Sequence, residues 1–103
     1  MSLEKLNAGD FTDLLASSPL LLLEFSSPGC APCRKSSQVI AELQAESDPP
    51  RFAAFAVDIT EAPELAQRFM IFSVPTTIVF VQGRENTRIS GVPNKEKLRS
   101  LLL

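Results

Sequence analysis

Two cysteines separated by two residues, Cys30 and Cys33, are the side chains with the clearest capacity for chemistry. Residues 20–25 before them form an apolar run typical of a buried strand, and residues 30–47 show the apolar spacing of a helix. The unpaired N–H groups and partial positive charge at a helix start stabilise a thiolate and lower its pKa. Because two intervening residues in a helical turn bring the sulfurs together, the pair is predicted to perform thiol–disulfide exchange.

Within this pair we expect Cys30 to be the more exposed nucleophile and Cys33, one turn deeper, to be the resolving thiol. Pro32 fixes the geometry of the turn between them. A purely structural pair is an alternative, since free cysteine packs as a small hydrophobic side chain. A zinc knuckle needs two further Cys or His ligands, which the chain lacks, so no metal site is expected. An iron–sulfur cluster bridging two copies of the motif is conceivable, but nothing else in the sequence indicates one.

Glu24 is the one charged residue in the apolar run 20–25. A carboxylate is costly to bury unless it is paired or protonated, and desolvation raises its pKa. These properties suit a proton acceptor for the thiol of Cys33 during disulfide exchange. The alternative is that Glu24 lies near the end of its strand and reaches water.

Composition excludes several other chemistries. The chain has no histidine, which rules out Ser-His-Asp triads, Cys-His dyads and His-bearing zinc sites. Its net charge of −2 offers no broad basic face for nucleic acid or an anionic membrane surface. The longest apolar run is too short to span a bilayer, and residues 1–5 lack a signal-peptide pattern. A length of 103 residues suits one domain, residues 1–103, which we expect to be cytoplasmic.

Apolar periodicity and turn residues divide the chain into alternating helices and strands. Helices are expected after residues 7–10, over 30–47, opening within 60–64, and after Asn94, a candidate N-cap. Strands are expected over 20–25, 52–59, 76–81 and 86–90, with 2–6 a candidate first strand and 82–85 a turn. This order predicts an α/β fold whose mixed sheet is flanked by helices on both faces.

Pro75 stands immediately before the β-branched run 76–81 and marks the entrance of that strand, because proline cannot donate to a central ladder. Cis is the minority form of X–Pro bonds, so the local sequence by itself does not predict a cis bond here.

Together these segments resemble the thioredoxin family over nearly the whole chain. Residues 30–33 resemble its Cys-Gly-Pro-Cys motif, residues 20–25 the strand before that motif, and residues 73–77 its cis-proline loop. Gly91 corresponds to the glycine that flanks the substrate groove. The resemblance implies a thioredoxin fold with a five-stranded mixed sheet and a cis Val74–Pro75 bond facing the thiols. The family's tryptophan before the first cysteine is replaced by Gly29.

The resemblance also implies an activity, the reduction of protein disulfides by a redox-active disulfide between Cys30 and Cys33. Glu24 takes the place of the family's buried aspartate, and Pro75 completes the catalytic set. The electrons would come from NADPH through a flavoprotein reductase, and the chain would bind neither as a cofactor. Disulfide-bearing proteins and a thioredoxin reductase-like donor are the expected partners of a monomer. The expected substrate contacts are Gly29, Ala31, Pro32, Val74, Gly91 and Val92.

Two other functions stay open at this point. A binding or chaperone-like module would use the same fold and groove without turnover, and the missing tryptophan favours it. A glutaredoxin-like enzyme would use glutathione, but that family usually carries Tyr or Phe between its cysteines, where this chain has Ala31 and Pro32.

Overall fold

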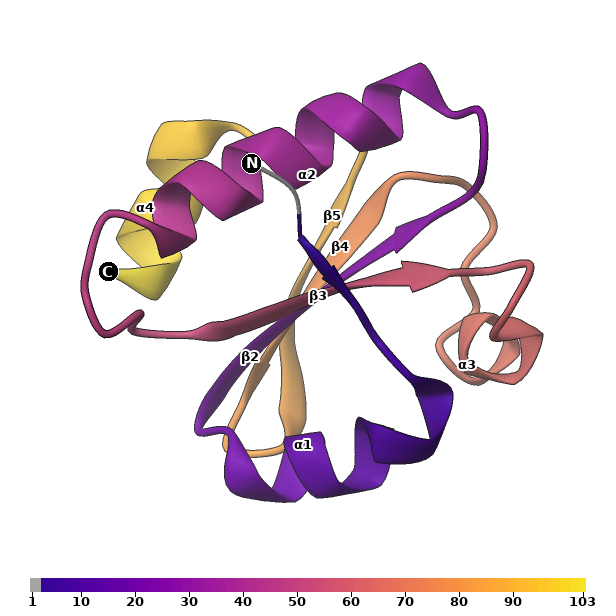
Figure 1. Ribbon diagram of the computed structural model, residues 1–103, viewed down its shortest axis with the longest axis horizontal. Helices are drawn as coiled ribbons and strands as arrows, with labels where there is room; N and C mark the ends of the chain where they lie inside the picture. Colours follow the sequence, from indigo (N-terminus) through magenta and orange to yellow (C-terminus); the bar gives the residue numbers. More distant parts are fainter. Residues whose placement is uncertain (1–2) are drawn as a thin grey trace.

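The central strand of the sheet is β2, Leu20–Ser26, in the computed structural model, which describes residues 3–103 (Figure 1). It pairs in parallel with β3, Ala53–Asp58, and antiparallel with β4, Thr76–Val81. With strands on both sides and helices on both faces, Leu21, Leu22 and Leu23 are fully buried. This double burial explains why the run lacks polar alternation.

The other elements complete a five-stranded sheet in the order β1-β3-β2-β4-β5. The first strand β1 is Glu4–Lys5 and the last strand β5 is Arg84–Ser90. The helices are α1 (Phe11–Ser17, after a 3-10 turn at Ala8–Asp10), α2 (Ala31–Gln44), α3 (Pro63–Arg68) and α4 (Lys95–Leu102). The predicted α/β class, with a mixed five-stranded sheet between helices, is confirmed.

Side chains of β2 alternate between two separate apolar layers. Leu21, Leu23 and Phe25 pack in one cluster with residues of α1 and α3. Leu22 packs in the other cluster with residues of α2 and α4. The helices covering these two faces lie on opposite sides of the sheet in Figure 1. By the same alternation, Glu24 points toward the face that α2 covers.

Several element boundaries differ from the predicted ones. The helix expected over 30–47 begins at Ala31, because Cys30 is its N-cap, and it ends earlier than predicted, at Gln44. The strand expected from residue 86 begins at Arg84, because a two-residue turn at Gln82 and Gly83 replaces the predicted turn 82–85. Both turn residues have positive φ, 52° and 80°, which suits a tight hairpin. Of the candidate strand 2–6, only Glu4–Lys5 is a strand, and residue 2 lies outside the described residues.

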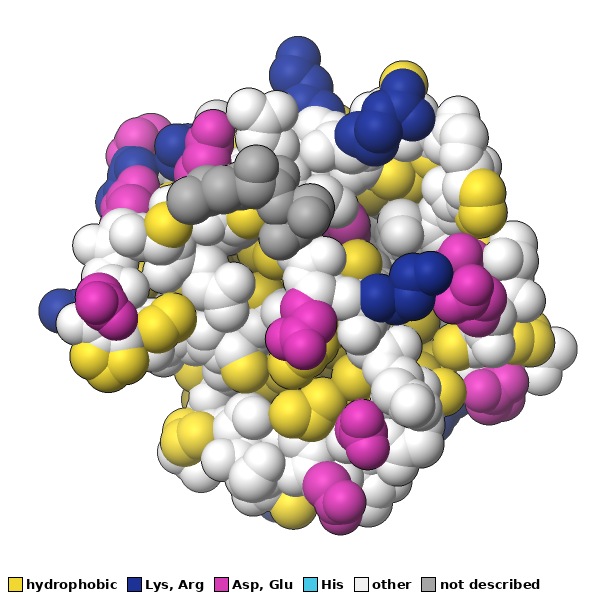
Figure 2. Space-filling model, viewed as in Figure 1, with side chains coloured by type: hydrophobic (Ala, Val, Ile, Leu, Met, Phe, Trp, Pro, Cys, Tyr) yellow, Lys and Arg dark blue, Asp and Glu magenta, His cyan; other side chains and the backbone are white. Residues whose placement is uncertain are grey.

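Two ion pairs join α4 to α2 and to the turn that follows α2. Lys95 Nζ lies 2.9 Å from Glu42 Oε1, and Arg99 lies 2.6 Å from Glu46. Asn94 is the N-cap of α4, as predicted, since its side chain accepts a hydrogen bond from the Lys97 N–H at 3.0 Å. Acidic and basic side chains are interspersed over the face shown in Figure 2, which fits the small net charge.

Phe11, the first residue of α1, is part of the apolar cluster between the sheet and helices α1 and α3. It is 2% exposed, and its ring centroid lies 5.7 Å from that of Phe69 and 6.1 Å from that of Phe80, both in edge-to-face geometry. We expect Phe11→Leu to lower the free energy of unfolding by about 1.5 kcal/mol, because leucine keeps the apolar contact but loses both aromatic pairs. Urea unfolding followed by circular dichroism measures this loss as a lower midpoint with an unchanged slope.

The matched control is the same substitution at an exposed ring. Phe72 is 91% exposed, so Phe72→Leu should change the free energy of unfolding by less than about 0.5 kcal/mol. Equal losses in the two variants would show that the aromatic cluster does not stabilise this layer.

Candidate active site

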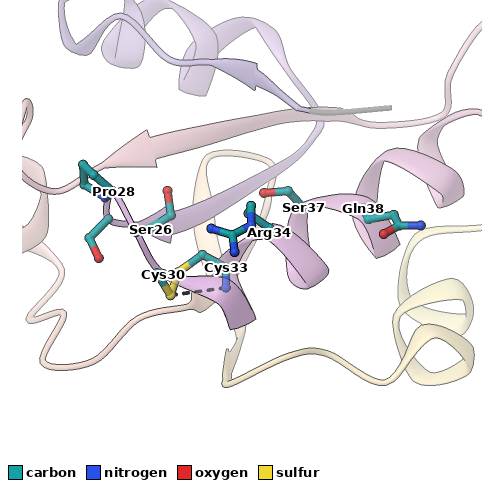
Figure 3. A pocket seen from close by; sticks show the side chains of 9 residues that line it. Ser26, Pro28, Cys30, Cys33, Arg34, Ser37 and Gln38 are labelled. Atoms are coloured by element: carbon teal, nitrogen blue, oxygen red, sulfur yellow. Dashed lines mark hydrogen bonds between the residues drawn. A yellow bond between two sulfur atoms is a disulfide. The ribbon is translucent and has the colours of Figure 1, made fainter.

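The two cysteines lie where the central strand meets α2. After β2 ends at Ser26, the chain turns through Gly29, whose φ of +75° favours glycine, and reaches Cys30. Cys30 and Cys33 form a disulfide with a Cα–Cα distance of 5.2 Å. The backbone N–H of Cys33 donates to Cys30 Sγ at 3.2 Å, the dashed line in Figure 3. The sulfur therefore occupies the position that an N-cap side chain fills, against the free N–H groups of the helix.

The two sulfurs differ in their access to solvent. Cys30 is partly exposed at the start of the helix, whereas Cys33 is 4% exposed and belongs to the buried face of α2. An incoming group therefore reaches Cys30 first. In the reduced protein, the Cys33 N–H that now contacts Cys30 Sγ would stabilise a thiolate at that atom.

Glu24 lies under α2 with no exposure to water. The Ser37 hydroxyl of α2 donates to Glu24 Oε1 at 2.5 Å. Its other oxygen, Oε2, has no hydrogen-bond partner among the described residues, and neither does Oγ1 of Thr77, the residue opposite Glu24 on β4. The alternative that Glu24 reaches water at the strand end is therefore wrong.

Burial sets the protonation of this carboxyl. Desolvation raises the pKa of Glu24 above its ordinary value, and the hydroxyls of Ser36 and Ser37 oppose this more weakly. No cation of residues 3–103 forms an ion pair with it, and its neighbour on β3 is the uncharged Ala56. Glu24 is thus a buried carboxyl that gains a proton more readily than an exposed one.

A second loop reaches the same edge of the sheet as the cysteines. The Val74–Pro75 peptide bond is cis, and β4 starts at Thr76, which pairs with Phe25 near the carboxyl end of β2. The Gly91 N–H donates to the Pro75 carbonyl at 2.8 Å, so Gly91 and Val92 lie beside this loop. Residues 74, 75, 91 and 92, selected from the sequence, are therefore brought together.

Two features of this edge were not predicted from the sequence. Phe72, two residues before Val74, is 91% exposed, and Met70 is 64% exposed. A cleft of about 500 Å³ beside the disulfide is lined by residues that include Arg34 and Gln38, seen around it in Figure 3. Neither feature has a periodic signal in the sequence, because the exposure of a side chain depends on whether a distant segment packs over it.

Other kinds of site find no support in the described part of the chain. Within residues 3–103 no group of three or more His, Cys, Asp or Glu side chains is placed to hold a metal ion. Over the same residues, none of the helices combines the length and apolarity needed to cross a membrane.

A disulfide at a helix start, with one accessible sulfur, one buried sulfur and a buried carboxyl under the same helix, is the site of a dithiol–disulfide exchange protein. The family model described as Thioredoxin matches residues 2–103. The chain therefore belongs to the thioredoxin family, and with its disulfide-forming pair it is a thiol–disulfide oxidoreductase of the protein-disulfide reductase type.

Individual relatives agree with this assignment. The chain is 34% identical over 93 residues to a thioredoxin of Chlamydia trachomatis, covering 90% of this chain and 88% of that protein. It is 32% identical over 98 residues to a bifunctional thioredoxin reductase/thioredoxin of Mycobacterium leprae, covering 95% of this chain and 21% of that protein. A mutant thioredoxin from Halobacterium salinarum has the same fold, with a TM-score of 0.84, 23% identity and coverage of 97% and 86%.

Proposed function

We propose that the protein reduces disulfides of other proteins with Cys30 as nucleophile and Cys33 as resolving thiol. The Cys30 thiolate attacks one sulfur of the substrate disulfide, forming a mixed disulfide and releasing one substrate thiolate. Cys33 then attacks Cys30 Sγ, which breaks the mixed disulfide and releases the second substrate thiolate. The substrate gains two electrons, and the Cys30–Cys33 pair loses two. The supporting observation is the contact of Cys33 N–H with Cys30 Sγ at 3.2 Å, together with the burial of Cys33.

Glu24 is proposed as the proton acceptor for Cys33. Residues 33 and 37 are four apart in α2 and therefore lie on the same face of the helix. Since the Ser37 hydroxyl contacts Glu24, the carboxyl lies under the face that also carries Cys33. Its raised pKa brings the carboxyl closer to neutral pH, where a general base works best. Removal of the Cys33 proton at this point produces the thiolate that resolves the mixed disulfide.

The loop at residues 72–75, together with Gly91 and Val92, is the proposed docking surface for protein substrates. Among residues 3–103 the backbone N–H and C=O of Val74 have no hydrogen-bond partner, so an extended segment is able to pair with them. Phe72 and Val92, 91% and 39% exposed, provide apolar surface beside this backbone. Gly29, Ala31 and Pro32 are the proposed contacts on the cysteine side.

Phe72→Ser tests this surface. If a protein substrate covers the ring, its loss should raise KM for insulin reduction about fivefold to tenfold with little change in kcat, because about 1 to 1.4 kcal/mol of apolar contact is lost. Leu101→Ser on α4 removes a large side chain that is 43% exposed and serves as the control. A KM for Phe72→Ser equal to that of Leu101→Ser would exclude Phe72 from substrate docking.

We further propose that the protein acts as a cytoplasmic monomer, reduced by NADPH through a flavoprotein reductase. The reductase as electron donor is supported by the name of the mycobacterial relative, a bifunctional thioredoxin reductase/thioredoxin. Insulin reduction coupled to NADPH oxidation by a bacterial thioredoxin reductase tests the donor. Turnover driven by glutathione alone would support the glutaredoxin-like alternative, and binding of insulin without turnover under both reductants would support the binding-module alternative.

A further inference from the structure

The cleft beside the disulfide lies apart from the loop at residues 72–75 and shares only Gly29 with the proposed protein-docking contacts. Ser26 and the two cysteines contribute to its wall from the strand end and helix start, and Arg34, Ser37 and Gln38 contribute from α2. None of residues 72–75, Gly91 or Val92 lines it. Its volume of about 500 Å³ is within the range of sites that take small organic molecules. A small ligand in this cleft would therefore lie against the redox-active sulfurs.

Arg34 gives the cleft its charge. It is the only charged residue in the lining, and no ion pair or side-chain hydrogen bond within residues 3–103 engages its guanidinium. Its backbone N–H donates to the Cys30 carbonyl at 3.3 Å, so it begins one helical turn, about 5.4 Å, beyond that cysteine. Because Arg34 and Cys30 both line the cleft, one molecule that carries a carboxylate and a disulfide is able to contact both.

Carboxylates on the segments around the cleft do not pair with Arg34 within residues 3–103. Asp58, the strand neighbour of Ser26, accepts from Thr60 through its side chain, and Glu42 pairs with Lys95. Neither residue lines the cleft. Glu24 is buried under Ser37, and desolvation raises its pKa, which reduces its negative charge relative to an exposed carboxylate. An anion in the cleft thus meets Arg34 as its principal charged partner.

We propose that this cleft is a second substrate site, which binds low-molecular-weight aliphatic disulfides that carry carboxylates. The inference rests on the dithiol chemistry proposed above and adds a substrate class to it. Arg34 holds the carboxylate, and the disulfide sulfur faces Cys30. The Cys30 thiolate attacks that sulfur and releases one small thiolate. Cys33 then attacks Cys30 Sγ and releases the second, so two small thiols form for each Cys30–Cys33 disulfide.

The test compares two probes of similar size with pre-reduced protein, dithiodipropionate, which is anionic, and bis(hydroxyethyl) disulfide, which is neutral. The oxidation rate is measured by acid quenching, alkylation and mass spectrometry, and dithiothreitol provides the intrinsic rate ratio of the two probes. Relative to dithiothreitol, the protein should favour the anionic probe. Arg34→Gln should lower this preference about tenfold, the effect of one charge-assisted hydrogen bond.

Lys35→Gln is the matched control, because it removes the same charge from the next residue of α2, which is exposed and does not line the cleft. The preference of Lys35→Gln for the anionic probe should stay within about twofold of that of the original protein. If both variants lost the preference for the anionic probe equally, the effect would come from the total positive charge of α2, and the proposed site would be rejected. No preference in the original protein, or no loss in Arg34→Gln, would also overturn it.

A second variant tests the space itself. Ser26→Trp places an indole at the wall of the cleft and should slow oxidation by both probes, because volume is lost whatever the charge of the probe. An unchanged rate in this variant would contradict binding in the cleft.

The two proposals fail in different ways, because this reaction needs neither a protein substrate nor a reductase. An Arg34-dependent preference without insulin reduction would leave the small-disulfide site standing and reject the proposed function. Insulin reduction without an Arg34-dependent preference would support the proposed function and reject the small-disulfide site.

Discussion

Cys30→Ser is expected to lower the rate of insulin reduction by at least about 10³-fold, down to the rate without protein. The partly exposed Cys30 Sγ is the atom that accepts the Cys33 N–H and the one that an incoming disulfide reaches first. A serine hydroxyl in its place is not ionised at neutral pH and does not attack a disulfide. The measurement is the rate of insulin precipitation with a reductant present. Turnover that survives the substitution would exclude the proposed chemistry.

Cys33→Ser is the companion variant and separates the two exchange steps. It retains the attacking thiolate but lacks the thiol that resolves the mixed disulfide. We expect it to turn over as poorly as Cys30→Ser, while accumulating a covalent complex with a disulfide-bearing protein through Cys30. A non-reducing gel shows this complex, and dithiothreitol releases it. A complex formed instead by Cys30→Ser, through Cys33, would reverse the assigned roles.

Glu24→Gln is expected to make the protein more stable and less active at the same time. In the folded state, desolvation raises the pKa of Glu24 above its ordinary value of 4.5. Above pH 4.5 the folded state therefore binds more protons than the unfolded state, and the stability of the original protein falls as pH rises toward the folded-state pKa. Glutamine does not titrate and escapes this loss.

A gain in the free energy of unfolding, on the order of 1 kcal/mol, is expected at pH 8, because burial penalises the charged form of Glu24 and glutamine stays neutral. It should disappear near pH 4, where the carboxyl is protonated in both states. Resolution of the mixed disulfide should slow by about 10²-fold at neutral pH, because the proton acceptor for Cys33 is lost. Urea unfolding at several pH values and rapid-quench measurement of the second exchange step test the two effects separately.

Glu42→Gln is the control for the stability effect. Its hydrogen bond with Lys95 is the main cause that lowers the pKa of Glu42, so its contribution is present above its ordinary pKa and is lost as pH falls. The substitution should therefore destabilise the protein at neutral pH, opposite in sign to Glu24→Gln. A Glu24→Gln protein that is less stable at pH 8 would show that the buried carboxylate is satisfied. An unchanged second step would remove Glu24 from the proton path.

The structure explains why the sequence pattern predicted some residues of the site and not others. Cys30 and Cys33 are fixed by their separation of three residues and by the helix that starts between them, which is local information. Glu24 was ambiguous, because a strand run does not show whether its last residues are covered. Its burial follows from pairing with Ala56 and Thr77 on either side and from the helix above it.

Local pattern alone determined the order of the elements, the mostly apolar central strand and the motif at the start of α2, since each depends on residues close together in the chain. The tertiary structure decided that the loop at residues 72–75 adjoins Gly91, that Phe72 has no covering segment, and that Arg34 borders an open cleft. The physical reason is that exposure and free space depend on long-range packing. A side chain's own type and spacing do not specify which distant segment will lie over it.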